Sequence, residues 1–335
     1  MIKVNLSHSF RTDFARKLLA VTGTFFLMLL SGLSIASAET VTIPGYAPEL
    51  GVEHTYRSKK SGLTDMSMWF DNPAAAGQTN YGDFRQRVTI TKNSTDSFLQ
   101  QWKLSADLPP DASGPLEMNN MFRNTLAAYG VEQLGIETDL NGSPIDLLDK
   151  DRIIANVKTV AASGAAGSET SGLDAIVQML EQNPLAVIEA IVPEAAYLST
   201  PQSHESGTYE IGQSWELEQE ESVNGFIVPV TSTWKVEATD PVRQTATMSW
   251  KQISDPVALA KTQEVTVTKL MASFSERVKT LTSEQLTYMR SASKTRDGNA
   301  VISLRDGTAI ELNEVLTVIS GGVKMVSTVH IMRED

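Results

Sequence analysis

Apolar and polar residues alternate through several short stretches of the chain, and turn-forming residues separate these stretches. Residues 88–91 alternate, a turn rich in Asn, Ser and Asp follows at 93–96, and a second alternating stretch spans 98–104. The same pattern joins 233–236 to 244–250. Alternation with a period of two places apolar side chains on one face of a strand, so each pair predicts an antiparallel hairpin.

Two further hairpins are predicted by Asx-Gly pairs that lie inside alternating stretches. The first pair is Asn141-Gly142 and the second is Asp306-Gly307. A two-residue type I′ turn needs positive φ at both central positions, and these pairs tolerate that geometry well. We therefore expect a tight I′ hairpin at each pair.

The predicted hairpins recur in one order, which indicates an internal duplication. A Glu-x-Gly strand start occurs at 49–51 and again at 210–212, and a Trp-Lys segment at 102–107 matches one at 250–255. An Asx-Gly hairpin then follows in both halves. Matches that keep their order are typical of a repeated unit. We therefore expect two halves built on one β-rich plan.

Apolar residues spaced three and four apart predict a helix in each half. In the first half this spacing covers 118–129. In the second half, Asp255 and Pro256 form an N-cap and first-turn pair ahead of a similar run. Residues 265–268 alternate Val and Thr as a strand would, so helix and strand stay open there. The helix is favoured only over 271–281.

A segment of different composition joins the halves. Residues 161–172 are almost all Ala, Gly, Ser, Thr and Glu, which is typical of a flexible linker. Two amphipathic helices separated by Asn183-Pro184 follow, and their apolar faces need a partner such as the concave face of a sheet.

The patterns together predict an α+β fold. We expect antiparallel curved β-sheets from two duplicated halves, with the helical segment between them packed on the sheet. The expected organisation is a signal peptide over 1–38, a first β-rich half over 39–160, a flexible linker and helical pair over 161–206, and a second β-rich half over 207–335.

The first 38 residues have the pattern of a secretory signal peptide. Basic residues precede an apolar stretch over 18–33, and Ala36-Ser37-Ala38 supplies the small residues that a signal peptidase accepts. An uncleaved membrane anchor is the alternative, but a spanning helix needs roughly 20 apolar residues, more than this stretch provides. We expect cleavage after Ala38, a periplasmic location and no integral membrane segment after cleavage.

Charge and cysteine usage narrow the possible functions. The chain of 335 residues has a net charge of −12 and contains no cysteine. Nucleic-acid binding needs clustered Lys and Arg, so no nucleic-acid partner is expected. A chain without cysteine forms no disulfide, carries no lipobox and offers no thiol nucleophile. Its stability must therefore come from a hydrophobic core.

No motif in the sequence assembles a catalytic or metal site. His54, His204 and His330 are isolated, without the i, i+4 spacing of a helical zinc pair. A Ser-x-x-Lys match at 291–294 lacks the partner motifs of penicillin-recognising enzymes, and a Gly-x-Ser stretch at 212–214 lacks the final glycine of a nucleophile elbow. We therefore expect no enzyme, no cofactor and no metal.

The acidic run at 216–221 has two interpretations. On a strand it places Glu216, Glu218 and Glu220 on one face, where they could attract calcium. The favoured interpretation is the solvated outer face of an edge strand, since charge there discourages association between sheets.

Five tryptophans fall in strand-like stretches. A sheet core is the favoured interpretation because large aromatic side chains dominate burial. The alternative is the lining of an apolar cavity, where flexible methionines such as Met66 and Met68 would suit variable ligands. The candidate ligand-lining residues are Trp69, Trp102, Trp215, Trp234 and Trp250.

Residues 209–215, Tyr-Glu-Ile-Gly-Gln-Ser-Trp, resemble a recurring strand start in a family of uncharacterised bacterial exported β-rich proteins. A late Asp-Gly hairpin, here at 306–307, also recurs in that family. The resemblance covers the region from Leu173 to the C-terminus, and it implies no assigned activity. The expected sheet with helical covers is similar, as architecture alone, to periplasmic lipoprotein-carrier proteins.

Two functions stay open on this basis. The first is a non-enzymatic binding or carrier module for an apolar ligand such as a lipid or acyl chain. The second is a structural or protein-interaction component of the bacterial cell envelope, with an envelope protein as its partner. The concave side of the sheet distinguishes them, because an open space favours a ligand and a solid core argues against one.

Overall fold

The structure is a computed structural model that describes residues 39–70, 77–104, 129–162, 206–223 and 226–335, and part of 177–198. Residues from Thr40 to Asp335 form one compact unit. The predicted signal peptide and nearly all of the predicted helix 118–129 lie outside the described residues. The first two residues of the predicted linker belong to a helix, and the rest of it also lies outside them.

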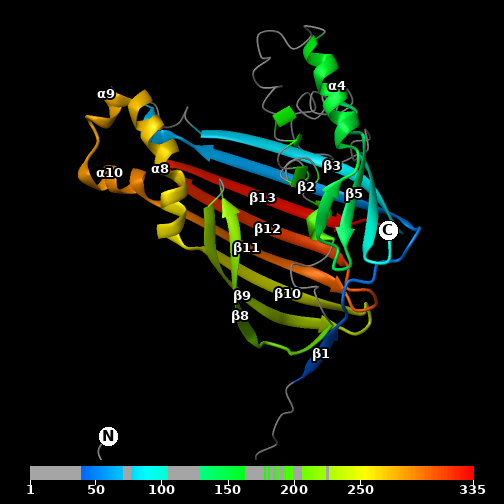
Figure 1. Cartoon of the computed structure of the whole chain (residues 1–335). Coiled ribbons are helices and arrows are strands. Elements are labelled where there is room, and N and C mark those ends of the chain that lie inside the picture. The colour runs from blue at the N-terminus through cyan, green and yellow to red at the C-terminus, as the bar shows by residue number, and fades with distance from the viewer. Residues whose placement is uncertain are drawn as a thin grey trace, which may run out of the picture. The chain divides into compact units, whose positions relative to one another are not determined.

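Eleven strands of the described chain form one curved antiparallel sheet (Figure 1). Their order is β6-β5-β4-β3-β2-β13-β12-β11-β10-β9-β8, so every strand lies beside a sequence neighbour, and β13 pairs with β2 where the two halves meet. The strands are β2 (Glu53–Asp65), β3 (Gly77–Lys92), β4 (Ser97–Leu104), β5 (Gln133–Asp139), β6 (Pro144–Leu147), β8 (Ser214–Val223), β9 (Phe226–Asp240), β10 (Thr245–Ser254), β11 (Ala292–Ser303), β12 (Ala309–Ser320) and β13 (Val323–Arg333).

A second, two-stranded sheet pairs β1 (Thr40–Ile43) with β7 (Gly207–Glu210). Its residues alternate between solvent and core, and Val41 and Ile43 are buried in the main hydrophobic cluster. This small sheet therefore packs against the core of the large one.

All four predicted hairpins are present, as β3–β4, β5–β6, β9–β10 and β11–β12. The prediction of type I′ turns is wrong. Gly142 and Gly307 have φ of 82° and 68°, but neither Asn141 nor Asp306 has a positive φ. A carboxylate organises a longer loop instead, because Asp139 Oδ1 accepts hydrogen bonds from the backbone N–H groups of Asn141 and Ser143 at 2.9 and 2.8 Å.

The helix of the second half starts earlier than predicted. Helix α8 (Pro256–Ser273) runs unbroken through 265–268, and α9 (Ser275–Val278) and α10 (Ser283–Arg290) follow. The preference for a helix over 271–281 alone was wrong. Burial of Leu259, Thr262 and Val267 overrides the β propensity of the Val-Thr stretch.

Two other helical parts contribute to the core. Helix α4 (Lys150–Ala162), which the sequence did not predict, buries Ile153 and Val157. In the predicted helical pair, the described residues Leu180, Ile188 and Val192 are buried in the same cluster as the sheet residues. The short helix α7 (Glu194–Tyr197) ends this part of the chain, so the expected packing of the helical segment on the sheet is confirmed where it is described.

One face of the large sheet carries the core, and we refer to it as the covered face. Strict register places Tyr56, Trp102, Trp234 and Trp250 on this face, and all four are buried. Trp250 lies over Gly298 of β11, where an added Cβ would lie 2.3 Å from the indole ring. Glycine at 298 therefore makes room for a tryptophan on the neighbouring strand.

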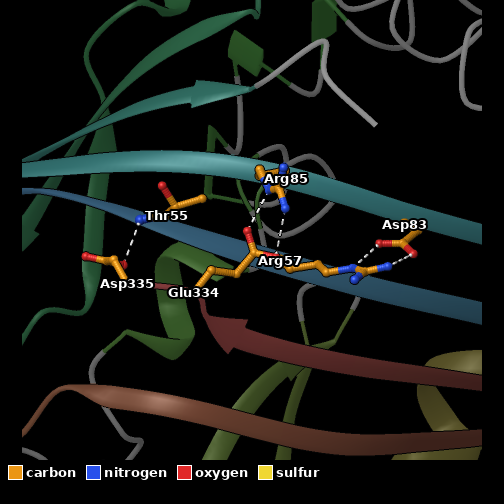
Figure 2. A network of polar contacts seen from close by, with 6 residues as sticks. All are labelled: Thr55, Arg57, Asp83, Arg85, Glu334 and Asp335. Atoms are coloured by element: carbon orange, nitrogen blue, oxygen red, sulfur yellow. Dashed lines mark hydrogen bonds and ion pairs between the residues drawn. The ribbon is translucent and has the colours of Figure 1, made fainter. Parts of the chain in front are cut away.

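A polar cluster on β2 and β3 ties down the C-terminus (Figure 2). Arg57 donates to both carboxylate oxygens of the buried Asp83 at 2.9 and 2.7 Å, and Arg85 donates to Glu334. The Thr55 backbone N–H donates to Asp335 at 3.1 Å. The bonds from Arg85 and Thr55 fix the residues that follow β13 beside β3 and β2, and the Arg57–Asp83 pair joins β2 to β3.

Candidate functional site

Helix α8 lies over one end of the covered face and is fixed there at its start. Asp255 Oδ1 accepts a hydrogen bond from the Ala258 backbone N–H at 2.6 Å, which caps the helix. Leu259 then packs against Val228 of β9 and Ala292 of β11 in a small cluster separate from the main core. The sheet therefore supports one side of α8 only.

An aromatic cluster fixes the other end of α8 to the turn between β12 and β13. Trp69 Nε1 donates to the Gly321 carbonyl at 2.9 Å, and the Trp69 ring lies 4.9 Å from the Phe274 ring at the C-cap of α8. The adjacent Gly322 has a φ of 74°, and a Cβ there would lie 2.6 Å from Met68 Sδ. Helix α8 is thus held at both ends, and the described residues leave one flank of it uncovered.

The uncovered flank of α8 borders a groove of about 780 Å³, closed on the other side by the junction of α10 with β11. Small-molecule sites commonly have volumes of about 300–1,000 Å³. Apolar side chains spaced three, seven and four residues apart along the helix line this groove. They are Val257, Ala260, Val267 and Met271, and Ala292 adds an apolar wall from the sheet.

Two cations and one carboxylate stand among the residues that line the groove. Lys261 and Glu264 come from α8, and Arg290 is the last residue of α10. All three are exposed. Within the described residues, neither Lys261 nor Arg290 takes part in an ion pair or a hydrogen bond of its side chain. The groove therefore offers an apolar wall and uncompensated positive charge.

A second group of charges crosses the covered face between α8 and the tryptophans. Lys294 pairs with Glu221, and Arg296 lies 3.7 Å from the buried Glu314. Tyr197 of α7 donates to Glu314 Oε1 at 2.6 Å. Burial raises the pKa of the Tyr197 hydroxyl, and the Glu314 carboxylate raises it further. This phenol therefore stays protonated and holds α7 on the sheet.

Glu194 makes a second contact between α7 and the sheet. Its side chain is fully buried, and Oε1 lies 2.9 Å from Lys60 Nζ of β2. The two atoms form an ion pair, and among the described residues neither carboxylate oxygen accepts a hydrogen bond. We regard the ion pair as the meaningful contact, because a buried carboxylate requires a nearby cation.

A shallower depression of about 510 Å³ follows strands β11, β12, β13 and β2. Its lining residues are mostly polar. Register aligns five of them in one row across the covered face: Trp250, Gly298, Glu314, Val329 and Lys60. Asn313 Nδ2 donates to Asn299 at 3.3 Å, and His330 pairs with Glu311 at 3.1 Å. This surface has no apolar wall comparable to that of the α8 groove.

The five tryptophans that the sequence suggested as ligand-lining residues do not lie together in one site. Trp102, Trp234 and Trp250 are packed in the core, with the last two rings 5.3 Å apart. Trp215 stacks on Tyr209 at 4.9 Å beside them, and Trp69 lies in the cluster that anchors α8. Trp250 borders the depression along β11, β12, β13 and β2, and none of the five lines the α8 groove. Their role as ligand-lining residues stays a prediction.

The remaining candidate residues lie in ordinary structural positions. Glu216, Glu218 and Glu220 are exposed on β8, which is an edge strand of the sheet, so this prediction is confirmed. His54 pairs with Asp335 at 2.6 Å, and His204 lies outside the described residues. The part of the chain that the structure describes contains no group of three or more His, Asp or Glu residues placed to hold a metal ion.

Sequence reasoning missed the α8 groove, although its signal was visible. The apolar positions 257, 260, 267 and 271 have the spacing of one helix face, although the sequence favoured a helix only over 271–281, and such a face is expected to be buried. Sequence alone did not show that the neighbouring α10 would leave part of that face open.

A comparison of the chain with protein-family models gives no match, and a comparison with curated proteins gives none either. Among the described helices, none is both long enough and apolar enough to cross a membrane.

Proposed function

We propose that the protein is a non-enzymatic module that binds or carries an apolar ligand, such as a lipid or acyl chain, in the groove beside α8. The observation that carries this proposal is a trough of about 780 Å³ with an apolar wall that the described residues leave open, whereas Trp102, Trp234 and Trp250 on the covered face are packed in the main core. Val257 on its wall is 64 % exposed. An apolar ligand would remove this surface from water.

The energetics favour a chain-like ligand. Burying one methylene group contributes about 0.8 kcal/mol, so each methylene that fits the groove should strengthen binding about fourfold. The side chains of the wall are aliphatic and lie along several turns of one helix. A flexible hydrocarbon chain can follow such a wall without needing hydrogen bonds from it.

We propose the α8 groove rather than the space beneath α7 because the latter is almost completely filled by side chains. The space beneath α7, between Tyr56, Tyr197 and Leu312, has a volume of about 10 Å³. This volume is at the lower limit for a single water molecule. A ligand could enter there only if α7 left the sheet, whereas the α8 groove accepts one without rearrangement.

The test of the proposed function is equilibrium binding of a fluorescent acyl probe to purified protein, with the groove filled by mutation. The change Ala260→Trp places a large ring in the trough and should weaken binding at least tenfold, about 1.4 kcal/mol. The matched control is Val265→Trp, which adds the same ring at a position that is 65 % exposed and does not line the groove.

Equal affinity of the two variants would contradict the site, and failure of the wild-type protein to bind any chain length would contradict the function. Native mass spectrometry of the freshly purified protein gives a second readout. We expect a co-purified lipid or fatty acid, which Ala260→Trp should remove.

We propose also that the chain is exported to the bacterial periplasm with cleavage after Ala38, in keeping with its resemblance to exported β-rich proteins. N-terminal sequencing of exported material should give a mature chain that starts at Glu39. A mature chain that still starts at Met1 would contradict this proposal.

We propose further that the two halves are copies of one unit. Strands β8 to β12 and strands β2 to β6 follow each other in the same direction across the sheet. Gly51 and Gly212 have similar φ of 78° and 86°, and their N–H groups donate to Ile90 of β3 and Val236 of β9 at 2.8 and 2.7 Å. An experimental structure in which the two sets of strands do not superpose with these glycines in register would contradict the duplication.

A further inference from the structure

We infer that the ligand of the α8 groove is a single acyl chain that ends in a carboxylate, and that Lys261 and Arg290 bind this headgroup. The inference rests on the proposed function and adds the chemical class of the ligand. It starts from the two exposed cations that line an otherwise apolar trough. A wholly apolar ligand would leave both cations without a function in binding.

The charge of the groove matches a headgroup with one negative charge. Lys261 and Arg290 have no ionic or hydrogen-bonding partner among the described residues, and Glu264 is the single acid among the lining residues. Two cations and one carboxylate leave one positive charge in excess. A guanidinium group also presents parallel N–H donors that suit the two oxygens of a carboxylate.

The shape and chemistry of the wall favour an acyl chain over a peptide. The lining residues from Val257 to Met271 span four turns of α8, roughly 21 Å at 1.5 Å per residue. No aromatic side chain lines the groove among the described residues, and the apolar wall along α8 consists of aliphatic side chains and Met271. An extended hydrocarbon chain can follow such a wall without hydrogen bonds from it.

The experiment compares a fatty acid with the fatty alcohol of the same chain length, which lacks the charge. For the wild-type protein the acid should bind about tenfold more tightly than the alcohol, since hydrogen bonds between charged groups are stronger than those of a neutral hydroxyl. In the double variant Lys261→Met with Arg290→Met, the ratio of the two affinities should fall to about one while alcohol binding stays within about twofold.

The control variant is Lys269→Met, which removes an exposed cation from the same helix at a position that does not line the groove. This variant should keep the wild-type ratio. Added salt gives a second readout, because it should weaken binding of the acid and leave the alcohol unchanged.

The outcomes separate this inference from the proposed function. Equal binding of acid and alcohol by the wild-type protein, or an unchanged ratio in the double variant, would overturn the headgroup assignment and leave the apolar groove standing. If the wild-type protein binds neither the acid nor the alcohol, both the proposed function and the headgroup assignment are overturned.

Discussion

The covered face of the large sheet has two regions that differ in how closely their side chains are packed. At one end Trp102, Trp234 and Trp250 are buried in one cluster, which also includes residues of α4 and of the described part of 177–198. At the other end α8 rests on the sheet along one side, and Val257 and Val265 remain 64 % and 65 % exposed. The first region is a packed core, and the second keeps an apolar trough of about 780 Å³ open.

This difference separates stability from function. Side chains of the packed region make close contacts in every direction, so a change of one group is felt by its neighbours. An exposed side chain of the trough wall, such as Val257, contacts fewer neighbours and adds less to folding. Substitutions in the packed region should therefore change stability most, and substitutions in the groove should change ligand binding most.

Removal of a core tryptophan should break the packed region. Trp102 is 1 % exposed, and its Nε1 donates to Gln100 at 2.9 Å. We expect Trp102→Ala to lower the free energy of unfolding by about 3–5 kcal/mol, because a large cavity remains. Val257→Ala in the groove should change it by about 0.5 kcal/mol or less. Urea unfolding checks both, and a similar loss in the two variants would remove the distinction between the regions.

Adding one methyl group should lower stability at a closely packed glycine and should not lower it at a glycine with open space around it. A Cβ at Gly298 would lie 2.3 Å from the Trp250 ring, whereas no atom lies within 4 Å of a Cβ built at Gly62 of β2. We expect Gly298→Ala to cost about 1–3 kcal/mol through overpacking. Gly62→Ala should be neutral or slightly stabilising. Thermal unfolding of both variants measures the difference, and a neutral Gly298→Ala would show that Trp250 is not held over β11.

Loss of the α8 cap should act on the groove region alone. Asp255 accepts a hydrogen bond from the Ala258 N–H at 2.6 Å. We expect Asp255→Ala to cost about 1 kcal/mol and Asp255→Ser to retain most of the cap. Hydrogen exchange should show faster exchange in the first turn of α8 with unchanged protection of β4 and β10. Equal loss of protection in these strands would mean that α8 and the core open as one unit.

Acid should loosen the anchor of α8 before it affects the core, and this is the smallest expected effect. Backbone and side-chain hydrogen bonds from Ser67 hold the pKa of the Asp65 carboxyl below its ordinary value. The stabilisation is therefore complete above the unfolded pKa of about 3.9 and is lost as pH falls through the lower folded pKa. Hydrogen exchange of 67–70 between pH 5 and 2.5 should show this step, and Asp65→Asn should lack it. If the change in hydrogen exchange with pH persists in Asp65→Asn, another titratable group causes it.

Local sequence chemistry was sufficient to predict the hairpins and the exposed edge. Alternation of apolar residues and turn-forming residues predicted β3–β4 and β9–β10, and charged alternation predicted the solvent-facing side of β8. These features depend on neighbours in sequence. The pairing of β13 with β2 joins residues such as Val329 and Lys60, and so distant a pairing leaves no local pattern to find.

The errors arose where tertiary contacts outweighed local preference. The Val-Thr alternation in 265–268 favours a strand, yet Val267 lies in α8 because burial decides its conformation. The Asx-Gly pairs favour I′ turns, yet Asp139 stabilises a different loop through its side chain. The groove was beyond sequence reasoning for a related reason: its existence depends on where α10 ends relative to α8.

The most direct test of the account is photo-crosslinking with a fatty acid that carries a photoreactive group within its chain, followed by mapping of the labelled peptides. The account predicts label on α8 between Val257 and Met271 and on the segment from Arg290 to Ala292, with the label lost in Ala260→Trp and kept in Val265→Trp. Label that falls instead on β4 and β10, around Trp102 and Trp250, would contradict it.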